Sequence, residues 1–225
     1  MRRYGLGATV SQLAQALYRL LHEFLPWRSK TRFGDLEYDW EHAVDTTRSN
    51  VSFRTQLAAT LTGHPYFASE PWIFQEMMQP LPPDRSEFTF VDLGSGKGRA
   101  LLMAAAHGFR RVMGVELIPE LNGIAQKNIA AFYTAHPASA SIQSLCLDAR
   151  DFQFPSDPLV VYLFNPFPEA VFAAVIENLR RSDADHPRPV WIAYRFPEFQ
   201  ELLSNCDWLE KVAGTEQWAV YRSSG

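Results

Sequence analysis

The sequence has little of what builds disulfide-rich, metal-binding or membrane-spanning proteins. Its 225 residues include 2 cysteines, Cys146 and Cys206, with no C-x-x-C spacing, and 6 histidines scattered without a metal-ligand spacing. We therefore expect buried thiols, no disulfide framework and no metal site. No apolar run reaches the roughly 18 residues that a membrane-spanning helix needs. No continuous apolar segment follows the basic start, which argues against a signal peptide.

An excess of basic charge is also absent. The formal net charge is −4, which argues against a dedicated nucleic-acid binder, because such proteins usually carry a basic stripe. The hydrophobic fraction of 47% is ordinary for a packed globule. The composition predicts a cytoplasmic enzyme with one α/β domain and an N-terminal extension.

The most informative segment is an apolar run that ends at Leu93 and the glycine turn that follows it. Gly94, Gly96 and Gly98 precede a helical pattern that begins at Arg99. Strand, glycine-rich turn and helix form the ligand-binding corner of nucleotide-type α/β folds. We expect these glycines to allow backbone angles that a Cβ disfavours, and to let a ligand approach the backbone closely.

The spacing of the glycines separates three ligand classes. A phosphate-binding loop requires Ser or Thr after its Gly-Lys pair, but Gly98 follows Lys97. A dinucleotide site requires G-x-G-x-x-G, and here the third glycine comes one residue early. Asp92 would repel a pyrophosphate but suits a cationic ligand with an ammonium group, such as S-adenosylmethionine. The alternative is a tight turn that binds nothing, which is disfavoured because a buried turn needs one such glycine rather than three.

Polar residues also end the next three predicted strands, at Glu116, Asp148 and Asn165. In open α/β sheets, ligands bind at the carboxyl ends of the strands, and an acid about 20 residues past the glycines binds ribose hydroxyls. We therefore expect Glu116 to bind ribose, Leu117 to pack on an adenine ring, and Asp148 to accept from the adenine amino group.

Hydrophobic periodicity predicts the remaining elements. Strands are expected over 88–93, 110–116, 141–147, 159–164 and 190–194, with a terminal hairpin over 208–212 and 217–221. Helices are expected over 10–25, 70–79, 99–106, 119–133, 169–181 and 199–203.

At these motifs the sequence resembles the class I S-adenosylmethionine-dependent methyltransferases. Val91–Gly98 is similar to motif I of that family, Gly114–Glu116 to its acidic ribose-binding motif, Leu147–Phe152 to its adenine motif, and Phe164–Phe167 to its motif IV. The likeness covers roughly residues 60 to 223. It implies a doubly wound, three-layer αβα sandwich with a mostly parallel seven-stranded sheet whose last strand is antiparallel.

The resemblance also implies the residues of the site. Asp92 would lie near the methionyl ammonium, Gly94 and Gly96 would approach the cofactor by backbone, and Asp148 with the Ala149 amide would read adenine. The implied cofactor-binding residues are Asp92, Gly94, Ser95, Gly96, Gly98, Glu116, Leu117, Asp148, Ala149, Asn165 and Tyr66, without a metal.

Asn165 and Phe167 are the catalytic residues that the resemblance implies. In amino-methylating members the asparagine and a backbone carbonyl hold the target nitrogen in line with the methyl sulfonium, and an aromatic residue stacks on the target. Asn165-Pro-Phe-Pro has one proline where those members have two, and also resembles motif IV of non-SET lysine methyltransferases. A weaker likeness, in Pro65–Ser69, is to a mitochondrial lysine methyltransferase family. The alternative for Asn165 is a helix start whose prolines stop the strand.

Aromatic residues gather near the expected mouth of the site, where an apolar channel would lower the pKa of an amine. They are Tyr66, Phe67, Trp72, Phe164 and Phe167; core packing is the expected role of each, because aromatic residues usually fill α/β cores, and lining the channel is the alternative. His64 and Glu70 are candidate proton acceptors, with surface positions as the alternative. Tyr194 and Arg195, at a further strand end, are candidates to face the substrate.

The first 62 residues form the part that the motifs explain least. We expect residues 1–62 to be a helical extension or lid before a methyltransferase domain over 63–225. The helix over 10–25 has an apolar stripe that could cap the sheet, form a homodimer or lie on a membrane surface. Trp40, Val44, Phe53 and Leu57 are the expected core residues of the extension.

The sequence thus predicts an S-adenosylmethionine-dependent methyltransferase that methylates nitrogen, with a protein lysine ahead of a small molecule as acceptor. The alternatives are a small-molecule N- or O-methyltransferase, a non-catalytic cofactor-binding scaffold, and an NAD oxidoreductase. No motif identifies the acceptor itself.

Overall fold

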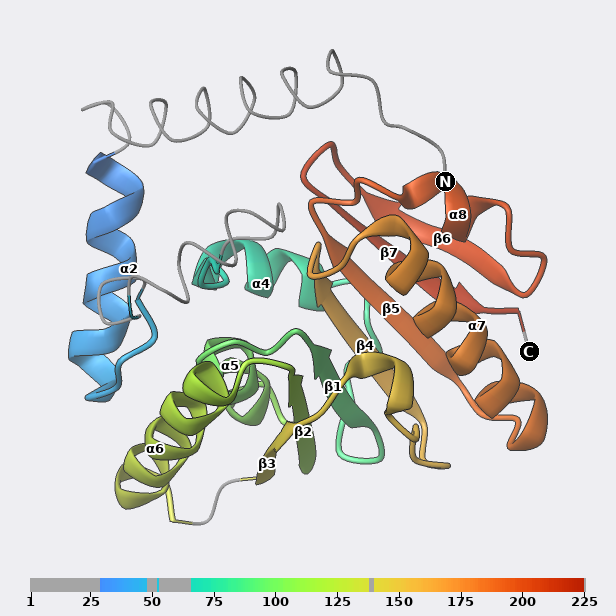
Figure 1. Cartoon of the computed structure of the whole chain (residues 1–225). Coiled ribbons are helices and arrows are strands. Elements are labelled where there is room, and N and C mark those ends of the chain that lie inside the picture. The colour runs from blue at the N-terminus through green and yellow to red at the C-terminus, as the bar shows by residue number, and fades with distance from the viewer. Residues whose placement is uncertain (1–28, 48–51, 53–65, 138–139, 225) are drawn as a thin grey trace, which may run out of the picture.

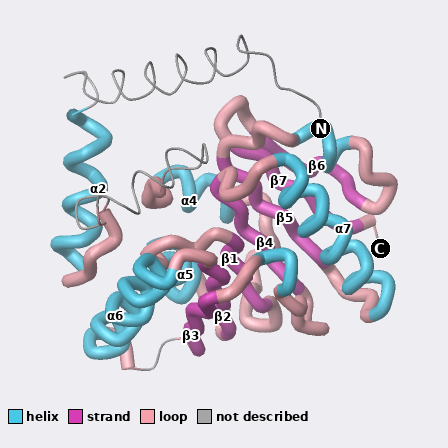
Figure 2. The backbone as a smooth tube through the Cα atoms, viewed as in Figure 1, coloured by secondary structure: helices cyan, strands magenta, loops and turns pink. Residues whose placement is uncertain are grey.

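The computed structural model shows a seven-stranded sheet with helices on both faces (Figure 1, Figure 2). It describes residues 29–47, 52, 66–137 and 140–224, with side chains from residue 36 onward. The predicted helix over 10–25, the predicted core residues Phe53 and Leu57, and His64 lie outside the described residues.

The sheet has the strand order β3-β2-β1-β4-β5-β7-β6. Strands β1 to β5 pair in parallel, and β7 runs antiparallel to both of its neighbours, β5 and β6. The seven predicted strands and the antiparallel last strand are therefore confirmed. Their bounds are β1 Thr89–Leu93, β2 Arg111–Glu116, β3 Ser141–Cys146, β4 Leu159–Phe164, β5 Val190–Arg195, β6 Leu209–Gly214 and β7 Trp218–Ser223.

The helices predicted within the described residues are also present. Pro71 and Pro119 occupy the first turns of their helices, where the missing N–H has no helical partner to lose. One helix extends to Asp185, past its predicted end at Arg181. The helical elements are α2 Ser29–His42, α4 Pro71–Met78, α5 Arg99–Ala106, α6 Pro119–Ala135, the 3-10 turn η3 Ala149–Asp151, α7 Glu169–Asp185 and α8 Gln200–Ser204.

The two faces of the sheet carry separate apolar cores because side chains alternate along each strand. Phe90 and Tyr162 pack with α4, α5 and α6, whereas Val91 and Val161 pack with α7 and α8. Figure 1 shows α7 across the sheet from α5 and α6. Buried on both faces, β4 matches its continuous apolar sequence. The predicted three-layer αβα architecture is confirmed.

Two predictions about side-chain burial are wrong. Trp40, expected in the core, is 90% exposed; it shares the outer face of α2 with exposed Leu36, whereas Tyr38 faces the domain and is buried. Cys146, expected to be buried, is exposed because it ends the edge strand β3. Cys206 is partly buried.

Candidate functional site

The glycine turn joins β1 to α5 at the carboxyl edge of the sheet. Gly94, Gly96 and Gly98 have φ angles of 84°, 53° and 86°, in the left-handed region that residues with a Cβ rarely adopt. The expectation that such a turn needs only one glycine is therefore wrong. The backbone of the turn requires all three, so their number does not by itself indicate a ligand.

Protein atoms also lie close to each of these glycines. A Cβ on Gly94 would overlap Pro166, and a Cβ on Gly96 would overlap the ring of Tyr66. A Cβ on Gly98 would lie 3.3 Å from the Cβ of Ala125. Pro166 thus brings the end of β4 against the turn, and Tyr66 covers the turn from the side of the N-terminal extension.

Glu116, at the end of β2, is hydrogen-bonded to the backbone of the glycine turn. Its carboxylate accepts hydrogen bonds from the N–H groups of Gly96 and Ile118, both at 2.8 Å. The N–H of Gly94 donates to the Val115 carbonyl at 2.8 Å. Burial raises the pKa of Glu116, and these backbone hydrogen bonds oppose the rise. Glu116 therefore sits where the sequence predicted and also fixes the shape of the turn.

Asp92, inside β1, is a buried carboxyl beside the turn. Its exposed fraction is 3%, and no basic side chain among the described residues forms an ion pair with it. Burial, with a smaller contribution from the charge of Glu116, raises the pKa of Asp92 well above its ordinary value. A cation placed beside Asp92 would offset both effects, so this position favours a positively charged ligand.

A cavity lies between the glycine turn and the segment that precedes α4. The hydroxyl of Ser95 in its wall is buried and has no hydrogen-bond partner among the described residues. The wall thus combines one acid, Asp92, and one base, Arg99, with four aromatic residues and several small ones. The lining residues are Tyr66, Phe67, Ala68, Ser69, Asp92, Gly94, Ser95, Arg99, Ala100, Tyr162 and Phe164.

The predicted adenine-reading residues follow β2 and β3. Asp148 accepts from the N–H of Arg150 at 2.9 Å and pairs with its guanidinium at 2.6 Å. These hydrogen bonds from Arg150 lower the pKa of Asp148. Ala149 is buried, and Leu117 is 64% exposed. Their positions past the strand ends are as predicted, whereas their roles toward adenine stay predictions.

Asn165 lies just past β4 in an unusual conformation. Its φ is 39°, and residues held in sparsely populated backbone regions cluster at functional sites. Its amide is fixed at both ends, because Nδ2 donates to Glu198 at 2.8 Å and Oδ1 accepts from the Tyr194 hydroxyl at 3.1 Å. β4 ends at Phe164 and Pro168 immediately precedes α7, so the segment 165–168 does lead into a helix start as in the alternative, although Asn165 itself does not cap that helix.

Arg195, at the end of β5, is buried, and its guanidinium has both an ion-pair partner and a hydrogen-bond partner. Its guanidinium pairs with Glu70 at 3.1 Å and donates to the Gln217 carbonyl at 2.7 Å. Glu70 is therefore an ion-pair partner. The guanidinium also lies 3.6 Å from the ring centre of Phe196, whose φ is 48°. The neighbouring strands β4 and β5 are thus each followed by a non-glycine residue with a positive φ, Asn165 and Phe196.

Some functional positions differ from the sequence expectations. Phe67 and Trp72 are exposed, so core packing is wrong for these two, while Tyr66, Phe164 and Phe167 are partly buried. Sequence reasoning missed Glu198, although an acid three residues past a strand end was a usable signal.

No protein-family model and no curated protein sequence matches this chain. Solved structures do match it. A protein of Methanococcus maripaludis described as an S-adenosyl-L-methionine-dependent methyltransferase matches with a TM-score of 0.50 and 16% identity, over 68% of this chain and 84% of that chain. A precorrin 8W decarboxylase from Methanobacterium thermoautotrophicum matches with a TM-score of 0.50 and 14% identity, over 71% and 93%.

An RNA methyltransferase from Salinibacter ruber in complex with S-adenosyl-L-homocysteine matches with a TM-score of 0.47 and 23% identity, over 70% of this chain and 92% of that chain. The chain has the class I methyltransferase fold. Likeness at these identities shows the fold alone, and a decarboxylase among the matches illustrates that one fold serves several reactions.

The described residues also bear on membranes and metals. Among them, no helix combines the length and apolar character needed to cross a bilayer. The same residues include no cluster of three or more His, Cys, Asp or Glu side chains suited to hold a metal ion.

Proposed function

We propose that this protein is an S-adenosylmethionine-dependent methyltransferase that methylates nitrogen, with the lysine side chain of a protein as the favoured acceptor. The observation that carries the proposal is the buried carboxyl of Asp92, which has a raised pKa and no basic partner among the described residues. The ammonium group of the cofactor would supply the missing cation. A pyrophosphate there would add repulsion instead.

The residues around the turn fit this cofactor. The hydroxyl of Ser95 has no hydrogen-bond partner among the described residues and lies beside Gly114 of β2, within reach of a rearrangement of the turn on ligand binding. The Glu116 carboxylate has about four lone-pair sites, of which the backbone N–H groups do not use all, so it can also accept from a ribose hydroxyl. Exposed Leu117 offers an apolar surface to an adenine ring. When bound, the cofactor supplies a methyl group on an electrophilic sulfonium.

Asn165 supports transfer to nitrogen. Its amide oxygen accepts from the Tyr194 hydroxyl, and an amide oxygen at the end of β4 is a group toward which an N–H of the acceptor can be oriented. Methyl transfer is an in-line displacement, so holding the nucleophile in one orientation is the main catalytic contribution. Two hydrogen bonds already fix the orientation of the Asn165 amide before the acceptor arrives.

The surroundings of Asn165 suit a lysine side chain. Glu198 is exposed and has no ion-pair partner among the described residues, so it is placed to attract an ammonium and to accept its proton, directly or through water. Phe67 and Phe196 are partly exposed and suit the apolar stem of the lysine. These features favour a cationic acceptor that arrives from solvent.

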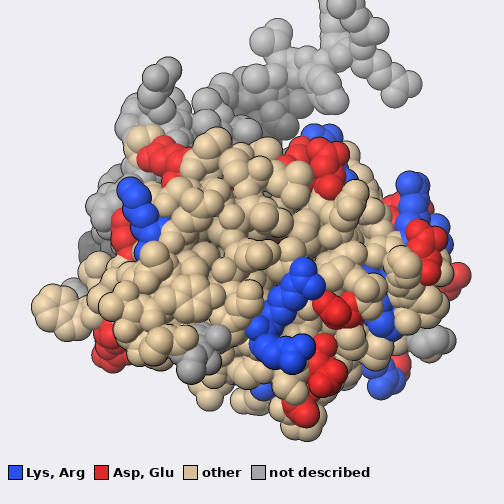
Figure 3. All heavy atoms as spheres, turned by 90° about the horizontal axis from the view of Figure 1, so that it is seen from below, with Lys and Arg blue, Asp and Glu red and all other residues tan. Residues whose placement is uncertain are grey.

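The distribution of charge favours such an acceptor over a nucleic acid. On the face of the molecule in Figure 3, basic and acidic side chains lie side by side, and a broad area carries neither. Nucleic-acid binders instead gather Lys and Arg on one face. An RNA methyltransferase is among the structural matches, so the test must include an RNA acceptor as an outcome.

Isothermal titration tests the cofactor. We expect S-adenosylmethionine to bind and NADH not to bind, because only the former brings a cation to Asp92 and no phosphate. Binding of NADH without binding of S-adenosylmethionine would replace the methyltransferase proposal with an oxidoreductase.

Methyl-labelled cofactor and a cell lysate test the acceptor. One half of the lysate is first treated with an amine-acetylating reagent, which makes lysine nitrogen non-nucleophilic. We expect label in the protein fraction of the untreated half and a large loss of that label after acetylation. Label in RNA or in small molecules, or protein label that survives acetylation, would overturn the lysine assignment while leaving the methyltransferase.

A further inference from the structure

The lysine of the glycine turn faces the N-terminal extension and not the cavity. Lys97 is fully buried, and its ammonium lies 2.9 Å from the carboxylate of Asp45 and donates to the Thr47 carbonyl at 2.5 Å. A charge is stable inside a protein only when it is paired and hydrogen-bonded. The turn can therefore keep Lys97 in this place only while Asp45 and Thr47 stay where they are.

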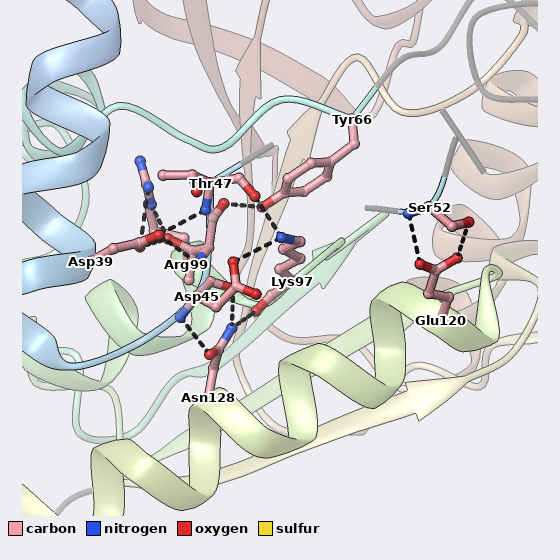
Figure 4. A network of polar contacts seen from close by, with 10 residues as sticks. Asp39, Asp45, Thr47, Ser52, Tyr66, Lys97, Arg99, Glu120 and Asn128 are labelled. Atoms are coloured by element: carbon pink, nitrogen blue, oxygen red, sulfur yellow. Dashed lines mark hydrogen bonds and ion pairs between the residues drawn. The ribbon is translucent and has the colours of Figure 1, made fainter. Parts of the chain in front are cut away.

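A second buried cation, Arg99, begins α5 and makes similar contacts. Its guanidinium donates to the Thr46 hydroxyl at 2.5 Å and pairs with Asp39 at 3.3 Å. Asp39 also accepts from the N–H groups of Thr46 and Thr47, at 2.7 and 2.8 Å. Figure 4 shows these side chains converging between α2 and the start of α5. Asp39 thus connects α2, the segment that follows it and the first residue of α5.

Asn128 of α6 joins the two main chains directly. Its Nδ2 donates to the carbonyls of Asp45 and Lys97, at 2.8 and 2.9 Å, and its Oδ1 accepts from the N–H of Asp45 at 2.8 Å. All three bonds appear in Figure 4. The backbone of the turn and that of the N-terminal segment are therefore fixed to one amide as well as through the side chain of Lys97.

The same segment also fixes the wall of the cavity. The Tyr66 hydroxyl donates to the Thr46 carbonyl at 2.6 Å, while its ring lies on Gly96. Farther along, Ser52 donates from its N–H and its hydroxyl to the Glu120 carboxylate, each at 2.8 Å. Glu120 is in the first turn of α6, three residues after Leu117. The N-terminal chain thus contacts both ends of the proposed cofactor site.

We infer that residues 39–47 set the shape of the cofactor site, and that Lys97 and Arg99 are positioning residues whose buried charges bind this segment to the glycine turn and the start of α5. The inference rests on the proposed function, because it assigns the turn to cofactor binding. The ion pair with Asp45 also explains why Lys97, although it follows Gly96 as in a phosphate-binding loop, does not serve a phosphate site. Its ammonium points to the N-terminal segment and Lys97 does not line the cavity. A cofactor then binds a turn whose shape the N-terminal segment sets.

Two variants and one matched control test this inference. Lys97→Met removes the buried charge at similar length, and Asp45→Asn removes its partner at a half-exposed position that tolerates the change. The control, Asp157→Asn, breaks the exposed 3.1 Å ion pair with Arg111 at the opposite edge of the sheet. Calorimetric titration gives the Kd for S-adenosylmethionine, and hydrogen exchange of residues 94–98 in cofactor-free protein reports the order of the turn. Thermal unfolding checks that each variant folds.

We expect Lys97→Met to weaken cofactor binding about tenfold and Asp45→Asn about fivefold, within the usual range of coupling between sites. Both should speed exchange at residues 94–98, and Asp157→Asn should change neither quantity. Wild-type affinity and unchanged exchange in a folded Asp45→Asn variant would overturn the inference, even where Lys97→Met fails to fold. If the wild-type protein binds no S-adenosylmethionine, the proposed function fails and the inference fails with it. If the wild type binds it and both variants bind it with the same Kd, the inference alone fails.

Discussion

The carboxyl edge of the sheet has two halves that treat their acids in opposite ways. Beside β1 and β2, Asp92 and Glu116 are buried with raised pKa values, and Glu116 is held by backbone N–H groups. Beside β4 and β5, Glu70 pairs with Arg195, and exposed Glu198 accepts from the amide of Asn165.

The two halves differ in whether their acids have partners. In the first half, Asp92 would gain a partner only from a bound cation. An unpaired buried acid destabilises the free protein, and a bound cation recovers that free energy. The acids of the second half are paired or exposed, so that half needs no ligand to balance its charge, and under the proposed function it binds the substrate from solvent. Lys97 lies in the turn next to Asp92 but does not neutralise it, because its charge is directed to Asp45.

Asp92→Asn removes the unpaired buried acid of the first half. Loss of one partner of a buried ion pair costs about 3–5 kcal/mol, so we expect the Kd for S-adenosylmethionine to rise at least about 100-fold. The cofactor-free variant should be more stable than wild type at pH 8 by about 1–3 kcal/mol, the penalty of an unsatisfied buried group. Calorimetric titration and thermal unfolding measure the two effects.

The sign of the pH dependence follows from the raised pKa of Asp92. The folded protein holds this proton at pH values where the unfolded chain has lost it, so the wild type loses stability as pH rises above about 4, the ordinary pKa of aspartate. Asp92→Asn lacks this loss, and its advantage should therefore shrink between pH 8 and pH 4. A variant less stable than wild type at pH 8, with unchanged affinity, would show that Asp92 is already neutralised.

Asn165→Ala, in the second half, should reduce turnover without weakening cofactor binding. We expect kcat to fall about 100-fold, as when a positioning group is lost, while the cofactor Kd stays within about twofold. Initial rates and titration on the same preparation measure both. Asn205→Ala, an exposed position at the end of α8, is the matched control and should leave both unchanged. Retention of full activity in Asn165→Ala would remove Asn165 from the mechanism.

The sequence predicted the parts of the fold that depend on short-range patterns. The apolar run over 159–164 became β4 with the same bounds, and Pro119 begins α6 as expected. The strand-end rule also brought Asp92, Glu116 and Asn165 to one edge, because the carboxyl ends of parallel strands must meet there.

What could not be predicted depends on partners far apart in the chain. Lys97 is 52 residues from Asp45, and a lysine between glycines gives no sign of being buried. Trp40 resembles a core residue by composition, but which face of α2 meets the domain is set by Tyr38 and by the pairing of Asp39 with Arg99. The left-handed φ angle of Asn165 is one that asparagine adopts more readily than most residues, whereas its contacts with Glu198 and Tyr194 depend on residues 33 and 29 positions away.

Gly94→Ala should break the separation between the two halves, since a Cβ there would overlap Pro166 next to Asn165. We expect a loss of about 2–4 kcal/mol in the free energy of unfolding, from left-handed strain and displaced atoms together, and a fall in kcat. Gly108→Ala is the control, because Gly108 has a φ of 89° but open space around its Cβ position. It should lose about 1–2 kcal/mol from backbone strain alone. Equal losses in the two variants, seen by chemical denaturation, would mean that Pro166 yields easily.

Glu198→Gln removes the exposed negative charge of the second half. Glutamine keeps an oxygen that accepts from Asn165, so the amide should stay in place while the negative charge is lost. For the lysine acceptor recovered from labelled lysate, we expect KM to rise up to about fivefold, the range of an exposed ion pair, with kcat changed less. In wild type KM should rise with added salt because such a pair is screened, and in the variant that dependence should largely vanish.

Glu201→Gln, an exposed acid on α8 with the same change in net charge, should behave as wild type. If both variants raise KM equally, the general charge of the molecule attracts the acceptor and Glu198 has no specific part. If Glu198→Gln alone does so, the exposed acid of the second half binds the cation of the acceptor, as Asp92 in the first half is proposed to bind that of the cofactor.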